Sequence, residues 1–355
     1  MNSLSSHTST QTLNTGGRIE YIDAMRGFTM ILVVLNHVAL FCLGITRSVP
    51  SYHIYLQEIQ MPLFFFISGF VLYKSNVQWD IKQTAKFITS KIPILIITPF
   101  IFLFIYLYIN NIPFHEGLFN KMKYGYWFTF VLFVFFIYYA LIRFLLNIFK
   151  INTIYSDISI FLLGFSFYFL RFIPINEDIK GLFCMNNWYQ FIFLAIGTLL
   201  KKHLQSFQAI LDHHPLLIIL IAVFFLLNIF NKETGLHSSL ILLFITALAG
   251  VILVFSLFRR YQALFSKKSI SGKCLQIIGQ RTLDIYLIHF FLLPVFLKDL
   301  ISSSLTSHPI PILELTLSLL IALIIIAGCL LISNILRLSP FLAHWLFGAK
   351  YPKNA

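Results

Sequence analysis

Charged residues are scarce in this sequence, and acidic residues are half as frequent as basic ones. Only 11% of the 355 residues are Asp, Glu, Lys or Arg, whereas 58% are hydrophobic. A soluble domain of this length does not need so much apolar surface, so the composition excludes a soluble protein. Strict alternation of apolar and polar residues is also missing, which excludes a transmembrane β-barrel. The predicted fold class is therefore an all-α, polytopic integral membrane protein.

Cysteine motifs are also lacking. The four cysteines form no CxxC pair and no metal-ligand spacing, so no metal site is expected. Cys42 and Cys184 both fall on the predicted outer side, which leaves a disulfide between them open. Unpaired small hydrophobic residues are the preferred interpretation of all four.

Long apolar runs, in contrast, are abundant. A helix that spans a bilayer needs about 20 mainly apolar residues. We expect about ten transmembrane helices, near residues 24–44, 54–73, 92–110, 127–149, 157–173, 188–200, 215–230, 237–257, 283–298 and 312–336.

The chain is expected to consist of one transmembrane domain with a short tail at each end. Residues 1–17 lack the basic and apolar regions of a signal peptide and are expected to form a disordered polar tail. Residues 18–340 are expected to form one transmembrane domain, and residues 341–355 a short cytoplasmic tail.

Lysine and arginine are distributed unevenly between the predicted loops. With the N-terminus in the cytoplasm, 19 of the 26 lie on the inner side and seven on the outer side, namely Arg47, Lys121, Lys123, Arg171, Lys180, Lys232 and Lys298. Positive charge favours the cytoplasmic side, so both termini are predicted to be cytoplasmic. Orientation explains most of the net charge of +13 without a nucleic-acid partner, and a basic inner face suits anionic lipid or a polyphosphate ligand.

The first apolar segment carries ionisable residues that a bilayer disfavours. Arg26 and His37 are 11 residues apart, which is within about 20° of a whole number of helical turns, so both project from one face. Asp23 lies three residues before Arg26, close enough for an ion pair. Ionisable groups at this depth usually face a cavity and are candidates for function. The alternative is structural: Arg26 extends to the interface beside Asp23, and His37 bonds a neighbouring helix.

Other polar residues mark three further segments. Glu58 and Gln60 lie at the predicted outer mouth, and Ser68–Gly69 allows another backbone to approach closely. Trp127 is typical of an interfacial belt, although it could also stack on a sugar ring. Thr282, Tyr286 and His289 share one helical face, while Arg281 and Asp284 are spaced for an ion pair. Hydrogen bonding between helices is the structural alternative for Tyr286 and His289.

Together these segments resemble the acyltransferase 3 family of membrane acyltransferases, which acylate cell-envelope glycans. "RIEYIDAMRGFTMILVVLNHV" is similar to the family's opening signature through Arg18, Asp23, Arg26, Gly27 and His37. "MPLFFFISGF", Trp127 in "YWFTFVLF" and "IGQRTLDIYLIH" resemble later segments in the same order. The first signature is the specific one, and the resemblance extends over residues 18–294.

The sequence departs from the family pattern at two places. Where the family often has an Arg pair before the third helix, this sequence has Lys86 and Lys91, which supply charge without a bidentate fork. At residues 282–284, "TLD" replaces a Ser-Tyr-Ser type pattern, so the resemblance implies no role for Asp284.

The resemblance implies transfer of an acyl group, usually acetyl, from cytoplasmic acyl-coenzyme A to a glycan hydroxyl. An imidazole titrates near neutral pH and can accept a hydroxyl proton, so His37 is the candidate general base. Arg26, oriented by Asp23, would hold the donor's phosphate or pantetheine, with Lys86 and Lys91 as further donor-binding candidates. The candidates for binding the acceptor are Glu58, Gln60, Trp127, Tyr286 and His289.

No permanently bound cofactor is expected; acetyl-coenzyme A or another acyl-coenzyme A is the donor substrate. The expected partners are this donor, a glycan or glycolipid acceptor and the bilayer, and the expected location is a bacterial inner membrane. The oligomeric state, the acyl group and the acceptor stay open. The alternatives are a transporter or flippase of lipid-linked sugars and a structural membrane subunit.

Overall fold

The computed structural model describes residues 18–45, 53–75, 77–170, 173–234, 240–300 and 310–349, which are mostly helical and contain no strand. The all-α prediction is confirmed for this part of the chain, and the expected tail at 1–17 lies outside it. The helices are α1 Glu20–His37, α2 His53–Leu72, α3 Ile81–Ile92, α4 Thr98–Ile109, α5 Phe114–Phe119, α6 Trp127–Ile148, α7 Thr153–Phe169, α8 Glu177–Leu182, α9 Phe191–Lys202, α10 Leu204–Leu211, α11 His214–Thr234, α12 Leu240–Arg260, α13 Ile270–Gln280, α14 Thr282–Ile288, α16 Pro311–Leu336 and α17 Pro340–Phe347.

Five continuous helices among the described residues are long and apolar enough to cross a membrane: Glu20–Cys42, Ile81–Ile109, Trp127–Ile148, Ile241–Arg260 and Pro311–Leu336. A sixth is present if α10 and α11, which meet at 83°, form one broken span. Every one of the ten expected segments contains helix, but several are short. Ten spans and cytoplasmic termini are therefore not confirmed, whereas the multi-pass membrane character is.

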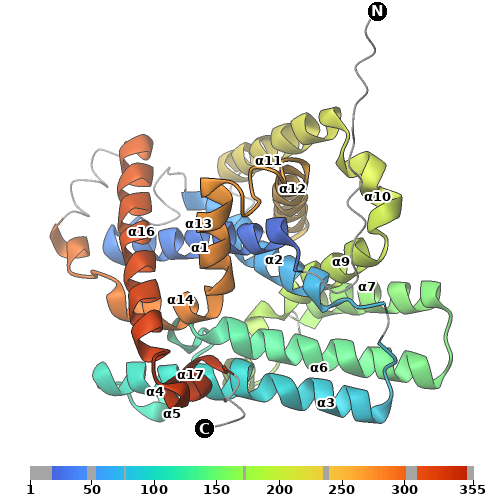
Figure 1. Ribbon diagram of the computed structural model, residues 1–355, viewed down its shortest axis with the longest axis horizontal. Coiled ribbons are helices and arrows are strands. Elements are labelled where there is room, and N and C mark those ends of the chain that lie inside the picture. Colours follow the sequence, from blue (N-terminus) through green and yellow to red (C-terminus); the bar gives the residue numbers. More distant parts are fainter. Residues whose placement is uncertain are drawn as a thin grey trace, which may run out of the picture.

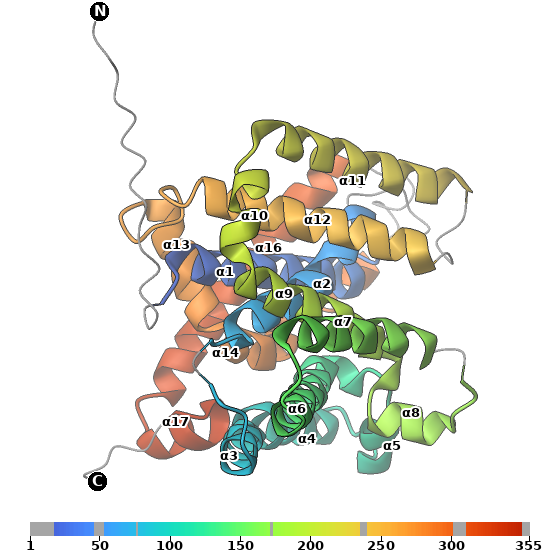
Figure 2. The same cartoon turned by 90° about the vertical axis from the view of Figure 1, so that its right-hand side faces the viewer.

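The helices pack in groups that bring distant parts of the chain together (Figures 1 and 2). Helix α6 lies between α3 and α7, and α11 runs alongside α12. Helix α1 crosses α13 and also contacts α2 and α16. These contacts place α1 inside the bundle, and 13 of its 18 residues are buried.

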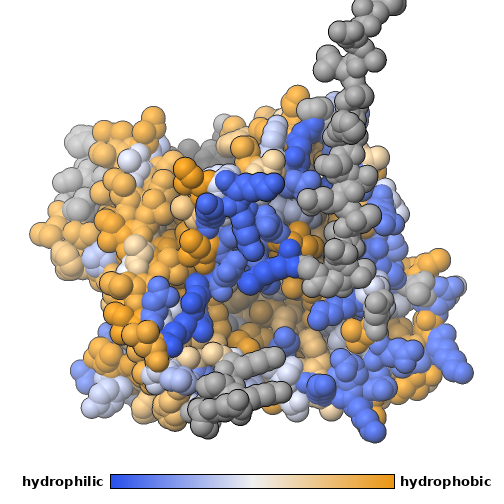
Figure 3. Space-filling view, viewed as in Figure 1, coloured by the Kyte–Doolittle hydropathy of each residue, from blue (hydrophilic) through white to orange (hydrophobic). Residues whose placement is uncertain are grey.

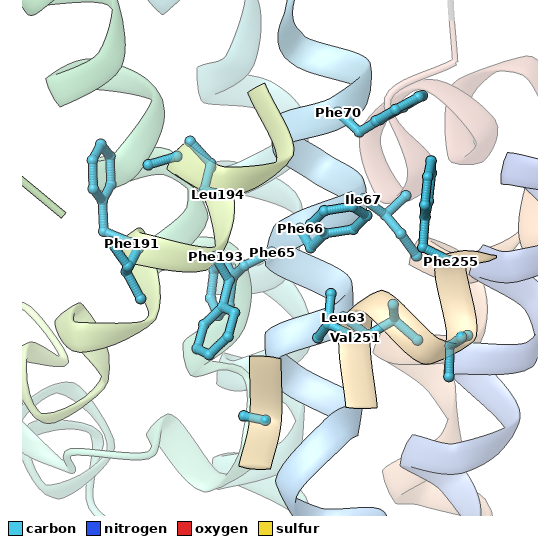
Figure 4. Packing of buried hydrophobic residues seen from close by; sticks show 14 of the residues in the cluster. Leu63, Phe65, Phe66, Ile67, Phe70, Phe191, Phe193, Leu194, Val251 and Phe255 are labelled. Carbon is cyan, nitrogen blue, oxygen red and sulfur yellow. The ribbon is translucent and has the colours of Figure 1, made fainter. Parts of the chain in front are cut away.

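A phenylalanine-rich core surrounds α2 (Figure 4). Its labelled residues come from three helices that meet there: Leu63, Phe65, Phe66, Ile67 and Phe70 of α2, Phe191, Phe193 and Leu194 of α9, and Val251 and Phe255 of α12. Glycine permits the closest contact, because a Cβ on Gly69 would lie 2.0 Å from the backbone oxygen of Leu194. A Cβ on Gly197 would lie 2.1 Å from the oxygen of Phe66. The close backbone approach predicted at Ser68–Gly69 is confirmed.

The cysteines do not cross-link these helices. All four are free thiols; Cys42, Cys184 and Cys329 are buried, and Cys274 is exposed. Cys42 and Cys184 thus have the unpaired form preferred from the sequence.

The molecular surface changes character between neighbouring helices. In Figure 3 hydrophilic residues gather over α13 and the beginning of α1, while the surface over α16 is mainly hydrophobic. The exposed α16 residues include Leu320, Ile324 and Leu331. Such an apolar surface is typical of a helix that faces lipid.

Candidate functional site

Helix α1 carries the two central candidates. Arg26 and His37 both retain partial exposure, whereas the residues before and after each of them, including Gly27 and Asn36, are buried. Directly after His37 the backbone becomes π-helical over Val38–Cys42. π-Helical turns are rare, and those that occur are frequent at functional sites.

His37 meets His289, which lies 252 residues later in the chain. Nδ1 of His37 is 2.8 Å from Nε2 of His289, and the two ring planes are within 3° of parallel. His289 is completely buried, and its Nδ1 lies 2.9 Å from the backbone oxygen of Ile285. The fold therefore joins α1 to the end of α14 through a pair of imidazoles.

The hydrogen bonds determine the tautomers of this pair. A carbonyl oxygen only accepts, so Nδ1 of His289 carries a proton and donates it to Ile285. Complete burial favours the neutral ring, whose Nε2 is then an acceptor. Nδ1 of His37 must donate to that Nε2. In neutral His37 the lone pair consequently lies on its own Nε2, the atom suited to accept a proton.

Aromatic rings border the histidine pair. The ring of Phe290 lies 4.9 Å from that of His37 and 4.1 Å from that of His289, measured between centroids. Phe41 lies 5.8 Å from His37. Gly125 adopts φ +102°, and a Cβ there would meet the Phe290 ring at 2.0 Å. The glycine thus lets the segment before α6 lie directly on the aromatic border.

Two tyrosines connect α14 to the beginning of α6. The Tyr286 hydroxyl donates to the Gly125 oxygen at 2.9 Å and accepts from the Phe128 amide at 3.2 Å. The Tyr126 hydroxyl donates to the Leu287 oxygen at 3.0 Å. Tyr286 therefore already has two backbone partners, and its position holds the helix that presents His289.

The other end of α1 carries an arginine pair around one carboxylate. Asp23 is 3% exposed, with its Oδ2 2.6 Å from Nε of Arg18 and its Oδ1 3.7 Å from Nη1 of Arg26. The predicted Asp23–Arg26 pair is present, but Arg18 is the closer partner. The Arg26 side chain remains 30% exposed, so part of the guanidinium is accessible.

Asp284 forms a second cluster of the same kind. It receives Nε and Nη2 of Arg337 at 2.9 and 2.8 Å, Nη1 of Arg281 at 3.2 Å, and the Ser333 hydroxyl. The spacing predicted the Arg281 pair. Ser333 and Arg337 lie about 50 positions away, and no local signal in the sequence connects them to Asp284.

The predicted acceptor-binding residues on α2 and α6 differ in exposure. Glu58 is half-buried, whereas Gln60 is 7% exposed and its Oε1 has no hydrogen-bond partner among the residues that the structure describes. Asn36, which precedes His37, is 5% exposed and also has an unpartnered Oδ1. Trp127 is 8% exposed and packs against Phe65, in the core rather than in an exposed aromatic belt.

The predicted donor-binding lysines lie on α3. Lys86 is exposed, and Nζ of Lys91 lies 5.5 Å from the Phe87 ring and 5.9 Å from the Phe136 ring. The structure thus brings His37 together with His289, and Arg26 with Asp23, but leaves the lysines on a separate helix.

Lys123 anchors the connection before α6. Its buried ammonium donates to the backbone oxygens of Gly181 at 2.6 Å, of Asn120 at 3.3 Å and of Leu118. Burial lowers the pKa of Lys123, and the three carbonyls compensate for lost water. Lys121 and Lys180 beside this segment bind Glu177 and lower the pKa of that carboxyl to about 2. Lys123 thus fixes the segment that lies on Phe290.

One cavity of the described structure contributes no polar group. A pocket of about 590 Å³ beside α4 is lined only by apolar residues, among them Phe100, Phe104 and Phe114. Within the described ranges no cluster of three His, Cys, Asp or Glu side chains could hold a metal ion. The histidine pair and the arginine clusters are therefore the groups that can take part in binding or proton transfer.

Comparison with known proteins identifies a family. The family model described as "Acyltransferase domain" matches residues 19–334, nearly the whole chain. No curated protein and no solved structure matches the chain.

Proposed function

Since this chain belongs to the acyltransferase domain family, we propose that it transfers an acyl group, most simply acetyl, from cytoplasmic acyl-coenzyme A to a glycan hydroxyl. The acceptor would be a cell-surface or lipid-linked glycan, and the protein would lie in a bacterial inner membrane. The observation that carries the proposal is the His37–His289 pair, which leaves a proton-accepting lone pair on His37 Nε2.

His37 acts as the general base in this reaction. Its Nε2 takes the proton of the acceptor hydroxyl while the hydroxyl oxygen attacks the thioester carbonyl carbon. The carbon–sulfur bond then breaks, and the imidazolium returns the proton to the departing coenzyme A thiolate. The products are an ester and coenzyme A thiol, so proton and electron pairs balance without a further reactant.

His289 supports the base without touching the reacting atoms. Its Nε2 holds the Nδ1 proton of His37, which fixes the tautomer and ring orientation. When His37 becomes an imidazolium, this hydrogen bond becomes charge-assisted and stronger. The surrounding Phe41 and Phe290 rings limit water that would hydrolyse the thioester.

Donor and acceptor enter from opposite ends of α1 in this proposal. Arg26, about 16 Å from His37 along the helix axis, binds phosphate or pantetheine groups of the donor. Asp23 holds Arg26 in place, and Lys86 and Lys91 on α3 are the further candidates for binding the donor. Gln60 has an unpartnered buried oxygen that can accept a sugar hydroxyl, and Glu58 and Trp127 are the other acceptor contacts.

Envelope vesicles supplied with radiolabelled acetyl-coenzyme A test the function. His37→Ala should reduce labelling of glycan about 10²- to 10⁴-fold, the usual contribution of a general base. Immunoblotting controls for the amount of protein. If a well-expressed His37→Ala variant labels glycan as strongly as the wild type, the mechanism is wrong. If neither protein labels glycan with any acyl donor, transport of lipid-linked sugars becomes the better explanation.

A further inference from the structure

A pocket with a mixed polar and apolar lining opens beside the Asp284 cluster, between α13 and α16. It has a volume of about 290 Å³ and is lined by Ile277, Gln280, Arg281, Leu330 and Asn334. None of these residues belongs to α1. The pocket is therefore lined by α13, Arg281 and α16, and not by the helix that carries Arg26 and His37.

The cluster next to this pocket has more positive than negative charge. Arg337 binds Asp284 through two nitrogens and by itself forms a complete bidentate pair. Arg281 contacts the same carboxylate only through Nη1, at 3.2 Å, and its side chain is 34% exposed. Two guanidiniums thus share one buried carboxylate, and an anion that binds Arg281 would balance the second positive charge.

The walls of the pocket indicate the kind of anion. Gln280 and Asn334 offer amide donors, which complement a phosphate oxygen. Ile277, which lines the pocket, and Leu331, which follows the lining residue Leu330 on α16, are both exposed apolar residues. A basic group next to a lipid-facing helix end suits the headgroup and chains of an anionic phospholipid. The volume is also too small to enclose a whole nucleotide-bearing donor.

We propose that Arg281, Gln280 and Asn334 form a phosphate site that is filled by the headgroup of an anionic phospholipid. Asp284 is the positioning residue of this site: it fixes the Arg281 guanidinium, while Arg337 and Ser333 satisfy its remaining acceptor capacity. The phosphate of free coenzyme A is the other source of the same chemistry.

Lipid binding to the purified full-length protein in detergent tests this site. Native mass spectrometry and thermal melting are measured with phosphatidylglycerol, with phosphatidylcholine and with coenzyme A alone. Phosphatidylglycerol should bind and raise the melting temperature more than phosphatidylcholine does. Arg281→Gln should weaken phosphatidylglycerol binding about tenfold or more, since a charge-assisted hydrogen bond is lost.

Two further variants separate the site from general effects. Asn334→Leu removes a pocket donor without touching Asp284 and should also weaken phosphatidylglycerol binding. Arg259→Gln, at an arginine paired with Asp212 on another helix, should leave it unchanged. Equal binding of the two lipids, or unchanged binding by both pocket variants, would overturn the proposal. If Arg281→Gln and Asn334→Leu lose coenzyme A binding but still bind phosphatidylglycerol, the site binds a phosphate of the donor. The lipid would then be excluded as its ligand.

Discussion

His289 differs from His37 in how its two ring nitrogens are engaged. Both are directed to protein groups, Nδ1 to Ile285 and Nε2 to His37, and the ring is completely buried. The sequence suggested a residue that binds the acceptor. These contacts favour a positioning role instead, and the two roles predict different kinetics.

Replacing His289 should lower the maximal rate more than the affinity for the donor. In His289→Ala the hydrogen bond that fixes His37 is lost, worth about 0.5–1.5 kcal/mol, so kcat should fall about 2- to 10-fold. KM for acyl-coenzyme A should change little, because the proposed donor contact Arg26 lies at the other end of α1. Initial rates over a range of donor concentrations, in membranes with matched protein amounts, give both constants.

The conservative variant provides the control. In His289→Gln the amide oxygen can still accept from Nδ1 of His37, so part of the lost rate should return. A purely structural role would make this variant as poor as His289→Ala. A rise in KM for the acceptor with kcat unchanged would instead support the original prediction of acceptor binding.

Local periodicity explains which features of the site could be predicted. The placement of Arg26 and His37 on one face follows from 11 residues of a single helix, and the Asp23–Arg26 pair follows from one turn. The partners His289 and Arg337 are set by tertiary packing, which no local pattern records. The sequence favoured an interfacial belt for Trp127, whereas the packing of α6 against Phe65 of α2 buries it.

At the level of helices, glycine decides how closely α1 and α13 approach. A Cβ on Gly27 would lie 1.9 Å from the Leu275 oxygen, and one on Gly279 would lie 1.8 Å from the Asp23 oxygen. This crossing holds Asp23 against the helix that leads into α14. The crossing thereby holds the arginine cluster and the histidine pair at fixed positions relative to each other.

Adding a methyl group at this crossing should destabilise the protein. Gly27→Ala and Gly279→Ala force backbones apart, and overpacking typically costs about 1–3 kcal/mol. The melting temperature in detergent should fall for both variants. Gly328→Ala is the matched control, because its Cβ would meet only a Leu292 methyl group at 3.1 Å. Equal stability of all three variants would contradict a backbone-limited crossing.

Hydropathy located helices better than it counted spans. The expected segment 92–110 is the end of a continuous helix that begins at Ile81. Its first part, α3, packs against α6 but carries polar residues on one face, so hydropathy did not include it. Conversely, α9 and α14 have only 12 and 7 residues. The average hydropathy of a segment does not show where a helix bends or ends. The helix bounds could therefore not be predicted from the sequence.

For the whole molecule, orientation in the membrane is the property on which the direction of acyl transfer depends. The excess of Lys and Arg predicts that α13 and the Asp284 cluster lie at the cytoplasmic face. Cys274 on α13 is a natural reporter of this face, because it is exposed while the other three cysteines are buried.

A membrane-impermeant maleimide should therefore label the native protein in inside-out vesicles and not in right-side-out vesicles. The control is Glu116→Cys in a Cys274→Ser background, which moves the exposed thiol to α5 on the predicted outer side. This variant should give the reverse pattern, and Cys274→Ser alone should not be labelled in either preparation. Labelling of native Cys274 from the outer side would show that the real orientation is the reverse of the predicted one. Arg26 would then face away from cytoplasmic acyl-coenzyme A, and the proposed direction of transfer would fail with it.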